Sequence, residues 1–149
     1  MRRFTAITSS LAVLSALALS ACEKSKDLTI THPYIRLAAN PKAPAVAYFD
    51  IKGGPTDDRL LMVTSPLVIR IELHESMMSG NMATMKPIEG GIAIPANTEV
   101  PFKQGGKHAM LFDINPSVKP GNTVQMNFTF ASGLTMQAYA PVRAAGEVL

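Results

Sequence analysis

Two histidines and a group of methionines are the side chains of this sequence that could bind a soft metal ion. His108 and Met110 are two residues apart, and His74 lies upstream of them. Because side chains two apart on a β-strand point the same way, His108 and Met110 would present one nitrogen and one sulfur together. Four further methionines lie between these segments: Met77, Met78, Met82 and Met85. Five of the eight methionines after Met1 thus fall between positions 77 and 110, and this clustering needs an explanation.

Packing is one explanation. Methionine fills cores readily, and an isolated His-x-Met pair is common by chance. The stretch from Met77 to Met85 is, however, interrupted by Ser79, Gly80 and Asn81, a polar, turn-like segment that offers little core to fill. Methionines at the tip of a loop indicate a role other than packing.

The chemistry of these side chains favours copper(I). Thioether sulfur and imidazole are soft, neutral ligands, whereas zinc prefers thiolate, imidazole and carboxylate, and calcium and magnesium prefer oxygen. No free thiolate is expected, because the single cysteine, Cys22, would be acylated at the end of the N-terminal signal described below. A blue-copper centre, which needs a cysteine thiolate beside two histidines, is therefore excluded.

Short strands must position these ligands. Apolar runs recur about every 8 to 12 residues between turn signals rich in proline and glycine, which predicts an antiparallel sandwich or barrel. No window keeps a 3.6-residue apolar period for three turns, so long helices are not expected. The predicted strands cover residues 28–31, 45–51, 60–64, 68–75, 83–87, 91–94, 99–103, 108–114, 123–130 and 134–139.

Alternation within two of these strands indicates which face meets the core. The apolar face of residues 123–130 comprises Val124, Met126, Phe128 and Phe130. The apolar face of residues 68–75 comprises Ile69, Ile71 and Leu73. His74 lies on the opposite face with Arg70 and Glu72, so the pattern of its own strand does not bury it.

The N-terminus has the layout of a secretory signal, in which Arg2 and Arg3 precede an apolar, small-residue run. This run is short and rich in serine and threonine, which argues against a transmembrane helix. It ends in Leu19-Ser20-Ala21-Cys22, which resembles the lipobox of bacterial lipoproteins, where the signal is removed and the cysteine is acylated. Acyl chains would hold the protein at a membrane. An ordinary cleaved signal with a chance cysteine is the alternative.

These signals divide the chain. We expect a lipoprotein signal peptide (1–21), a lipid tether (22–27), a single domain (28–143) and a short C-terminal tail (144–149). Removal of the signal leaves 12 basic against 11 acidic residues, without a cluster of lysine and arginine, so the sequence gives no case for a nucleic-acid partner.

The spacing of the ligand residues resembles that of a known family, the PCu(A)C-type periplasmic copper(I) chaperones. The family pattern is a histidine, a methionine after ten residues, and a His-x-Met after about twenty-one more. Here His74 is followed after ten residues by Met85 and after a further twenty-two by His108-Ala109-Met110. The similarity extends over residues 28–141 and includes Tyr34-Ile35-Arg36, Ala47-Tyr48-Phe49, Asp58-Arg59-Leu60 and Met85-Lys86-Pro87.

This resemblance implies an all-β, cupredoxin-like Greek-key barrel or sandwich in the periplasm or cell envelope. It implies that copper(I) is held by His74, Met85, His108 and Met110 and is delivered to the CuA centre of cytochrome c oxidase subunit II, or to a related extracytoplasmic acceptor. Met77, Met78 and Met82 would shield the site or assist capture. Some relatives hold a second copper ion in a His/Met-rich tail, which this C-terminus lacks.

Other interpretations remain open. A passive copper buffer or resistance lipoprotein would use the same ligands, and a structural lipoprotein would use the methionines only for packing. An enzyme is not expected, because Ser76 and Ser79 have no recognisable base and Glu72 and Glu75 read as solvated residues. His32 precedes Pro33, so we expect it to be extended and solvent-exposed.

Overall fold

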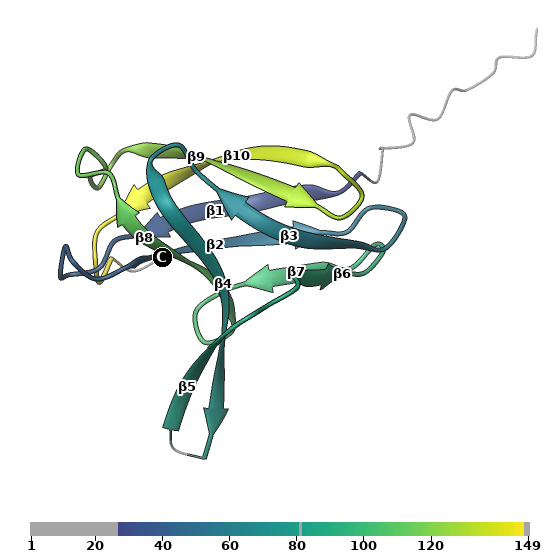
Figure 1. Cartoon of the computed structure of the whole chain (residues 1–149), viewed down its shortest axis with the longest axis horizontal. Coiled ribbons are helices and arrows are strands. Elements are labelled where there is room, and N and C mark those ends of the chain that lie inside the picture. The colour runs from purple at the N-terminus through teal and green to yellow at the C-terminus, as the bar shows by residue number, and fades with distance from the viewer. Residues whose placement is uncertain (1–26, 81, 148–149) are drawn as a thin grey trace, which may run out of the picture.

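Ten β-strands and no α-helix make up the part of the chain that the computed structural model describes, residues 27–80 and 82–147 (Figure 1). The strands are β1 (Thr29–Arg36), β2 (Ala45–Lys52), β3 (Asp58–Thr64), β4 (Val68–Ser79), β5 (Met82–Pro87), β6 (Ile92–Ile94), β7 (Glu99–Phe102), β8 (Lys107–Ile114), β9 (Thr123–Phe130) and β10 (Thr135–Arg143). Within these ranges, no helix is long and apolar enough to cross a membrane. The predicted signal peptide and Cys22 lie outside the described residues.

The strands form two sheets joined along one edge. In order of pairing, β5, β4, β8, β7, β2 and β1 form the first sheet, and β10, β9, β3 and β6 form the second. The first and last strands connect the two sheets in parallel, with Ile35 beside Val142. β7 and β8 also meet in parallel, at Phe102 and Lys107. The all-β prediction is confirmed, and the strands pair antiparallel as predicted except at these two contacts.

Aromatic rings from both sheets meet in the core. Phe49 of β2 stacks on Phe102 of β7 with centroids 4.2 Å apart, and it meets Phe128 of β9 edge-on at 4.9 Å. The predicted apolar face of β9 is fully buried as well. Since burial of these faces fixes the orientation of every strand, it also determines which side chains of β4 and β8 point outward.

The β4–β5 hairpin projects from the sandwich (Figure 1). β4 runs four residues further than predicted, and beyond Glu75 its ladder continues with β5 alone. Met77 and Met78 therefore lie in a strand and not in the predicted loop, while Gly80 takes the positive φ (62°) of the turn. The cross-strand ladder satisfies the backbone polar groups of the hairpin, so its side chains can remain exposed.

Three local predictions are wrong. Ile69, expected on the core face, is 84% exposed, and Asp113 opposite it has a φ of 53°, which interrupts the regular alternation of β8. β1 continues past Pro33, because a register shift between Thr31 and Tyr34 accommodates the proline. His32, in this irregular segment, has a φ of 51° and is not extended, although its side chain is exposed as expected.

Candidate metal centre

His74 of β4 and His108 of β8 lie directly opposite each other in the sheet. Their ring centroids are 6.0 Å apart and their planes are inclined by 32°. Two imidazoles that bind one metal ion at about 2.0–2.1 Å per nitrogen have centroids roughly 5 to 6.5 Å apart. The spacing of the two rings therefore fits a shared ion.

The two predicted sulfur ligands occupy the same outer face of the sheet. Met110 lies two residues after His108 on β8, opposite Glu72. Met85 of β5 lies opposite Ser76, which is two residues after His74 on β4. Because opposite residues, and residues two apart, share a face of a sheet, both methionines flank the histidine pair. One methionine lies on each side of β4.

The three additional methionines lie on different faces of the β4–β5 hairpin. Met78 lies opposite Ala83 and shares the face of Met85 by alternation, whereas Met77, opposite Thr84, is on the other face of the hairpin. Met82 is on that second face as well, by its place in β5. All three are exposed, by 48% for Met77 and by 70% or more for the other two. Packing in a core thus does not account for them.

His108 is only 3% exposed although it points away from the core of the sandwich. The ring of Tyr48 on β2 covers one side, with its centroid 6.4 Å from that of His108. Burial raises the pKa of Tyr48, although Arg36 opposes this shift, so the phenol stays neutral and accepts a hydrogen bond from Arg36 Nη2 at 3.0 Å. Residues from the neighbouring strands therefore form a wall beside the histidine pair.

A backbone carbonyl anchors the His108 ring. Gly106 O accepts a hydrogen bond from His108 Nδ1 at 2.9 Å and a second from the backbone N–H of Ser76 at 3.0 Å. The same carbonyl thus connects the loop before β8 to the point where the hairpin leaves the sandwich. This pair of contacts holds His108 against β4, next to His74.

Glu72 is a site residue that the sequence analysis assigned to solvent. Its Oε2 lies 3.0 Å from Nε2 of His74, and its other oxygen pairs with Arg70. The hydrogen bond with His74 is the largest cause that lowers the pKa of Glu72, and the charge of Arg70 adds to it. The signal was present in the sequence, because Glu72 precedes His74 by two residues and shares its face of the strand. Glu75, the other carboxylate assigned to solvent, pairs with Lys107 at 2.8 Å on the opposite face.

The remaining nitrogen of His74 has no partner. Nδ1 is buried and makes no hydrogen bond, which is a costly state for a polar atom unless something binds it. Among the described residues, no three His, Cys, Asp or Glu side chains cluster in a way that could hold a metal. A metal at the histidine pair would thus need the thioethers, and a set of imidazole and thioether donors selects copper(I) over zinc.

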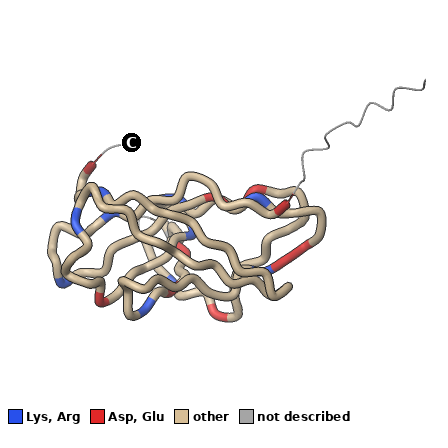
Figure 2. Tube along the Cα trace, turned by 90° about the horizontal axis from the view of Figure 1, so that it is seen from above, with Lys and Arg blue, Asp and Glu red and all other residues tan. Residues whose placement is uncertain are grey.

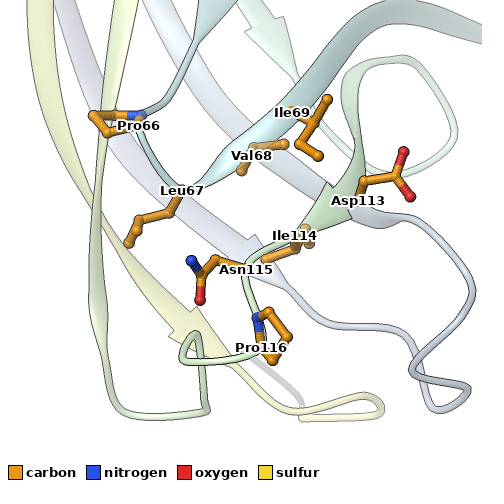
Figure 3. Close-up of a pocket in the computed structure, with 8 residues that line it drawn as sticks. All are labelled: Pro66, Leu67, Val68, Ile69, Asp113, Ile114, Asn115 and Pro116. Atoms are coloured by element: carbon orange, nitrogen blue, oxygen red, sulfur yellow. The ribbon is translucent and has the colours of Figure 1, made fainter.

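A separate cleft of about 530 Å³ lies at the far end of β4, between the start of this strand and the end of β8 (Figure 3). Its lining comprises Pro66, Leu67, Val68, Ile69, Asp113, Ile114, Asn115 and Pro116. The cleft contains neither imidazole nor sulfur, so it does not compete with the histidine pair as a soft-metal site. Basic and acidic residues are interspersed over the described part of the chain (Figure 2).

Comparisons of sequence support a lipoprotein relationship. A family model described as "Putative lipoprotein LpqE-like" matches residues 28–142. "Putative lipoprotein Lxx21020" of Leifsonia xyli subsp. xyli is 26% identical over 98 residues, which cover 65% of this chain and 59% of that protein. This chain thus spans about three fifths of the length of that relative.

Comparisons of structure identify the fold. A domain described as the copper-bound PCuAC domain from PmoF2 superposes with a TM-score of 0.65 at 24% identity, covering 79% of this chain and 93% of that one. The solution structure of CuI-DR1885 from Deinococcus radiodurans gives 0.63 at 26% identity, covering 83% and 84%. The predicted resemblance to the PCu(A)C type, with its cupredoxin-like single domain, is therefore confirmed.

Proposed function

We propose that this chain, which belongs to the LpqE-like family of lipoproteins, is an extracytoplasmic chaperone that binds a single copper(I) ion as cargo. The observation that carries the proposal is the 6.0 Å separation of the His74 and His108 rings on one outer face of the sheet. The solved structures of similar fold support it, because two of them are described as copper-bound or CuI forms.

His74, Met85, His108 and Met110 are the proposed ligands. All four of these ligands are neutral, and no thiolate is among them. Such imidazoles and thioethers suit a soft monovalent ion. The half-exposed Met85 would be the ligand most open to an incoming partner, whereas the buried His108 would be the least open. An acceptor could therefore replace the ligands in sequence, beginning at the hairpin.

Transfer of copper(I) to an acceptor would depend on which protein offers the stronger ligands. A site of imidazoles and thioethers protects copper(I) but binds it less strongly than thiolates, so an acceptor that offers cysteines would draw the ion away. We propose the CuA centre of cytochrome c oxidase subunit II, or a related extracytoplasmic assembly factor, as this acceptor. The chain itself would carry out no catalysis.

The exposed methionines of the hairpin would have two roles. Met78 shares the face of the ligands, so it could take up copper(I) on its way to His74. Met77 and Met82 lie on the other face, where they would shield the hairpin or contact a partner. Only Met78 is thus proposed as an auxiliary ligand during capture.

Two measurements test the proposal. X-ray absorption of the copper(I)-loaded protein should count two nitrogen and two sulfur neighbours, and a spectrum without sulfur would overturn the ligand set. Incubation with a purified apo CuA domain should then move copper to that domain. Copper that stays on the chain while the acceptor remains apo would favour a passive buffer over a chaperone.

Anchoring at a membrane is the second part of the proposal. The family model is described as "Putative lipoprotein LpqE-like", and Cys22 ends a lipobox-like motif, so we propose residues 1–21 as the signal peptide and Cys22 as the acylated residue. Residues 22–27 would tether the domain of residues 28–143 to the membrane surface, and residues 144–149 would form its tail. Metabolic labelling with palmitate should mark the unsubstituted protein and not Cys22→Ser, which should leave the membrane fraction.

A further inference from the structure

Each histidine of the pair has one ring nitrogen in a hydrogen bond and one that is free of such a bond in the described residues. For His108, the bonded nitrogen is Nδ1, whose partner is the carbonyl of Gly106. A carbonyl oxygen can only accept, so Nδ1 carries the proton and Nε2 keeps its lone pair. The backbone therefore assigns His108 to the tautomer that binds metal through Nε2.

His74 has the opposite arrangement. Its Nε2 lies 3.0 Å from the carboxylate of Glu72, and an ionised carboxylate also only accepts. Nε2 thus carries the proton, and the lone pair is on Nδ1. That atom is buried and without a hydrogen bond, as expected for a nitrogen whose natural partner is a metal ion.

Glu72 is itself held in place. It precedes His74 by two residues on β4, it lies opposite Met110 of β8, and its second oxygen pairs with Arg70. Arg70 in turn rests on the ring of Phe112, with its guanidinium carbon 3.9 Å from the ring centroid. A chain of contacts along the outer face of β4 thus aims one carboxylate oxygen at one nitrogen of His74.

We propose that Glu72 is a positioning residue of the copper site, which fixes His74 as the Nε2–H tautomer so that copper(I) binds through Nδ1 of His74 and Nε2 of His108. This inference rests on the proposed function and deepens it. A carboxylate behind a metal-binding imidazole fixes the orientation of the ring and makes its free nitrogen a better donor. Glu72 would act through His74 and would not touch the ion.

The tautomers can be measured in the metal-free protein. Long-range ¹H–¹⁵N spectra of ¹⁵N-labelled imidazoles separate protonated from unprotonated nitrogens. We expect a protonated Nε2 on His74 and a protonated Nδ1 on His108. Glu72→Leu should give a mixture of tautomers at His74 and leave His108 unchanged, whereas Glu72→Gln, whose amide oxygen can still accept, should retain the original tautomer. A single unaltered His74 tautomer in Glu72→Leu would overturn the positioning role.

Copper(I) affinity provides the second measurement. Loss of a hydrogen bond behind a metal-binding histidine lowers affinity about 10- to 100-fold, so we expect that loss in Glu72→Leu and a change of no more than about threefold in Glu72→Gln. Glu75→Gln is the matched control, because it removes a carboxylate from the opposite face of β4, where Glu75 pairs with Lys107. It should bind copper(I) like the parent, and an equal loss in Glu75→Gln would assign the effect to surface charge.

The experiment distinguishes the two proposals. Spectra of the complex with silver(I), a diamagnetic substitute for copper(I), show which nitrogen binds the metal. Binding through Nε2 of His74, or a direct bond to Glu72, would overturn the tautomer assignment and leave the proposed function intact. Failure of the unsubstituted chain to bind either ion would instead overturn the proposed function.

Discussion

His74 and His108 are opposite residues of neighbouring antiparallel strands, and their rings are 6.0 Å apart on the outer face of the sheet. The two residues are distant in the sequence, and the pairing of β4 with β8 brings them together. A slip of one residue in that pairing would turn one ring toward the core. The site is thus as rigid as the register of these two strands.

Replacement of either histidine should remove tight copper binding. His74→Leu and His108→Leu each delete one of two nitrogen donors, so we expect the affinity for copper(I) to fall by at least about 100-fold in either variant. Competition with a chromophoric copper(I) chelator measures this. His32→Gln is the matched control, because His32 is the third histidine of the chain and its exposed ring contacts Asp50 instead. Equal losses in the control would mean that histidine content, and not the pair, determines binding.

The two proposed sulfur ligands can be removed without a large change of shape. Met85→Leu and Met110→Leu should each reduce the sulfur count in X-ray absorption by one. The cost to the free energy of unfolding should stay below about 1.5 kcal/mol, because leucine and methionine have similar volumes. Met62→Leu, at a half-exposed position on β3, should leave the count unchanged. A constant sulfur count in both ligand variants would mean that other methionines bind the ion.

The sequence predicted all ten strands, because proline and glycine mark their ends and alternation marks their buried faces. The buried face of β9 follows its alternation completely. Ile69 departs from the same rule, because Asp113 opposite it has a positive φ that alternation cannot reveal. The length of β4 was also missed, since the exposed methionines of a projecting ladder resemble those of a loop.

Only part of the candidate site could be predicted from local sequence patterns. Alternation alone places His108 and Met110 on one face, and it could have identified Glu72 as a neighbour of His74. The pairing of His74 with His108 could not be derived in this way, because β5, β6 and β7 lie between their strands in the sequence, and β6 pairs with β3 while β7 pairs mainly with β2. That contact was predicted only through the resemblance to a known family.

The hairpin methionines should differ in how they affect capture. Met78→Leu removes the thioether that shares the ligand face, so we expect uptake of copper(I) from a weak chelator to slow several-fold while the equilibrium affinity changes by less than about twofold. Met77→Leu and Met82→Leu, on the other face, should leave the rate unchanged. Stopped-flow mixing measures these rates. Equal slowing in all three variants would indicate that the whole hairpin, and not one face, takes up the ion.

The pH dependence of stability should depend on Asp58, at the start of β3. Burial raises its pKa, but hydrogen bonds to Oδ2 from Ser132 Oγ (2.6 Å) and to Oδ1 from the backbone N–H groups of Arg59 and Ser132 outweigh this and lower the pKa below 3.8. A carboxyl group whose pKa is lowered by folding stabilises the protein above its unfolded pKa, and this contribution is lost as the pH falls through the folded pKa. Asp58→Ala should therefore lower the free energy of unfolding by about 1 kcal/mol near neutral pH, and the difference should shrink below pH 3.8.

Denaturant unfolding of the parent and of Asp58→Ala across this pH range measures the effect of Asp58. Glu89→Ala is the control, because Glu89 is an exposed carboxylate in a turn far from Ser132 along the chain. It should follow the parent at every pH. If the difference between Asp58→Ala and the parent stays constant from pH 7 to below pH 3.8, the charge of Asp58 does not matter. The cost would then come from the lost turn contacts alone, since those do not require an ionised carboxylate.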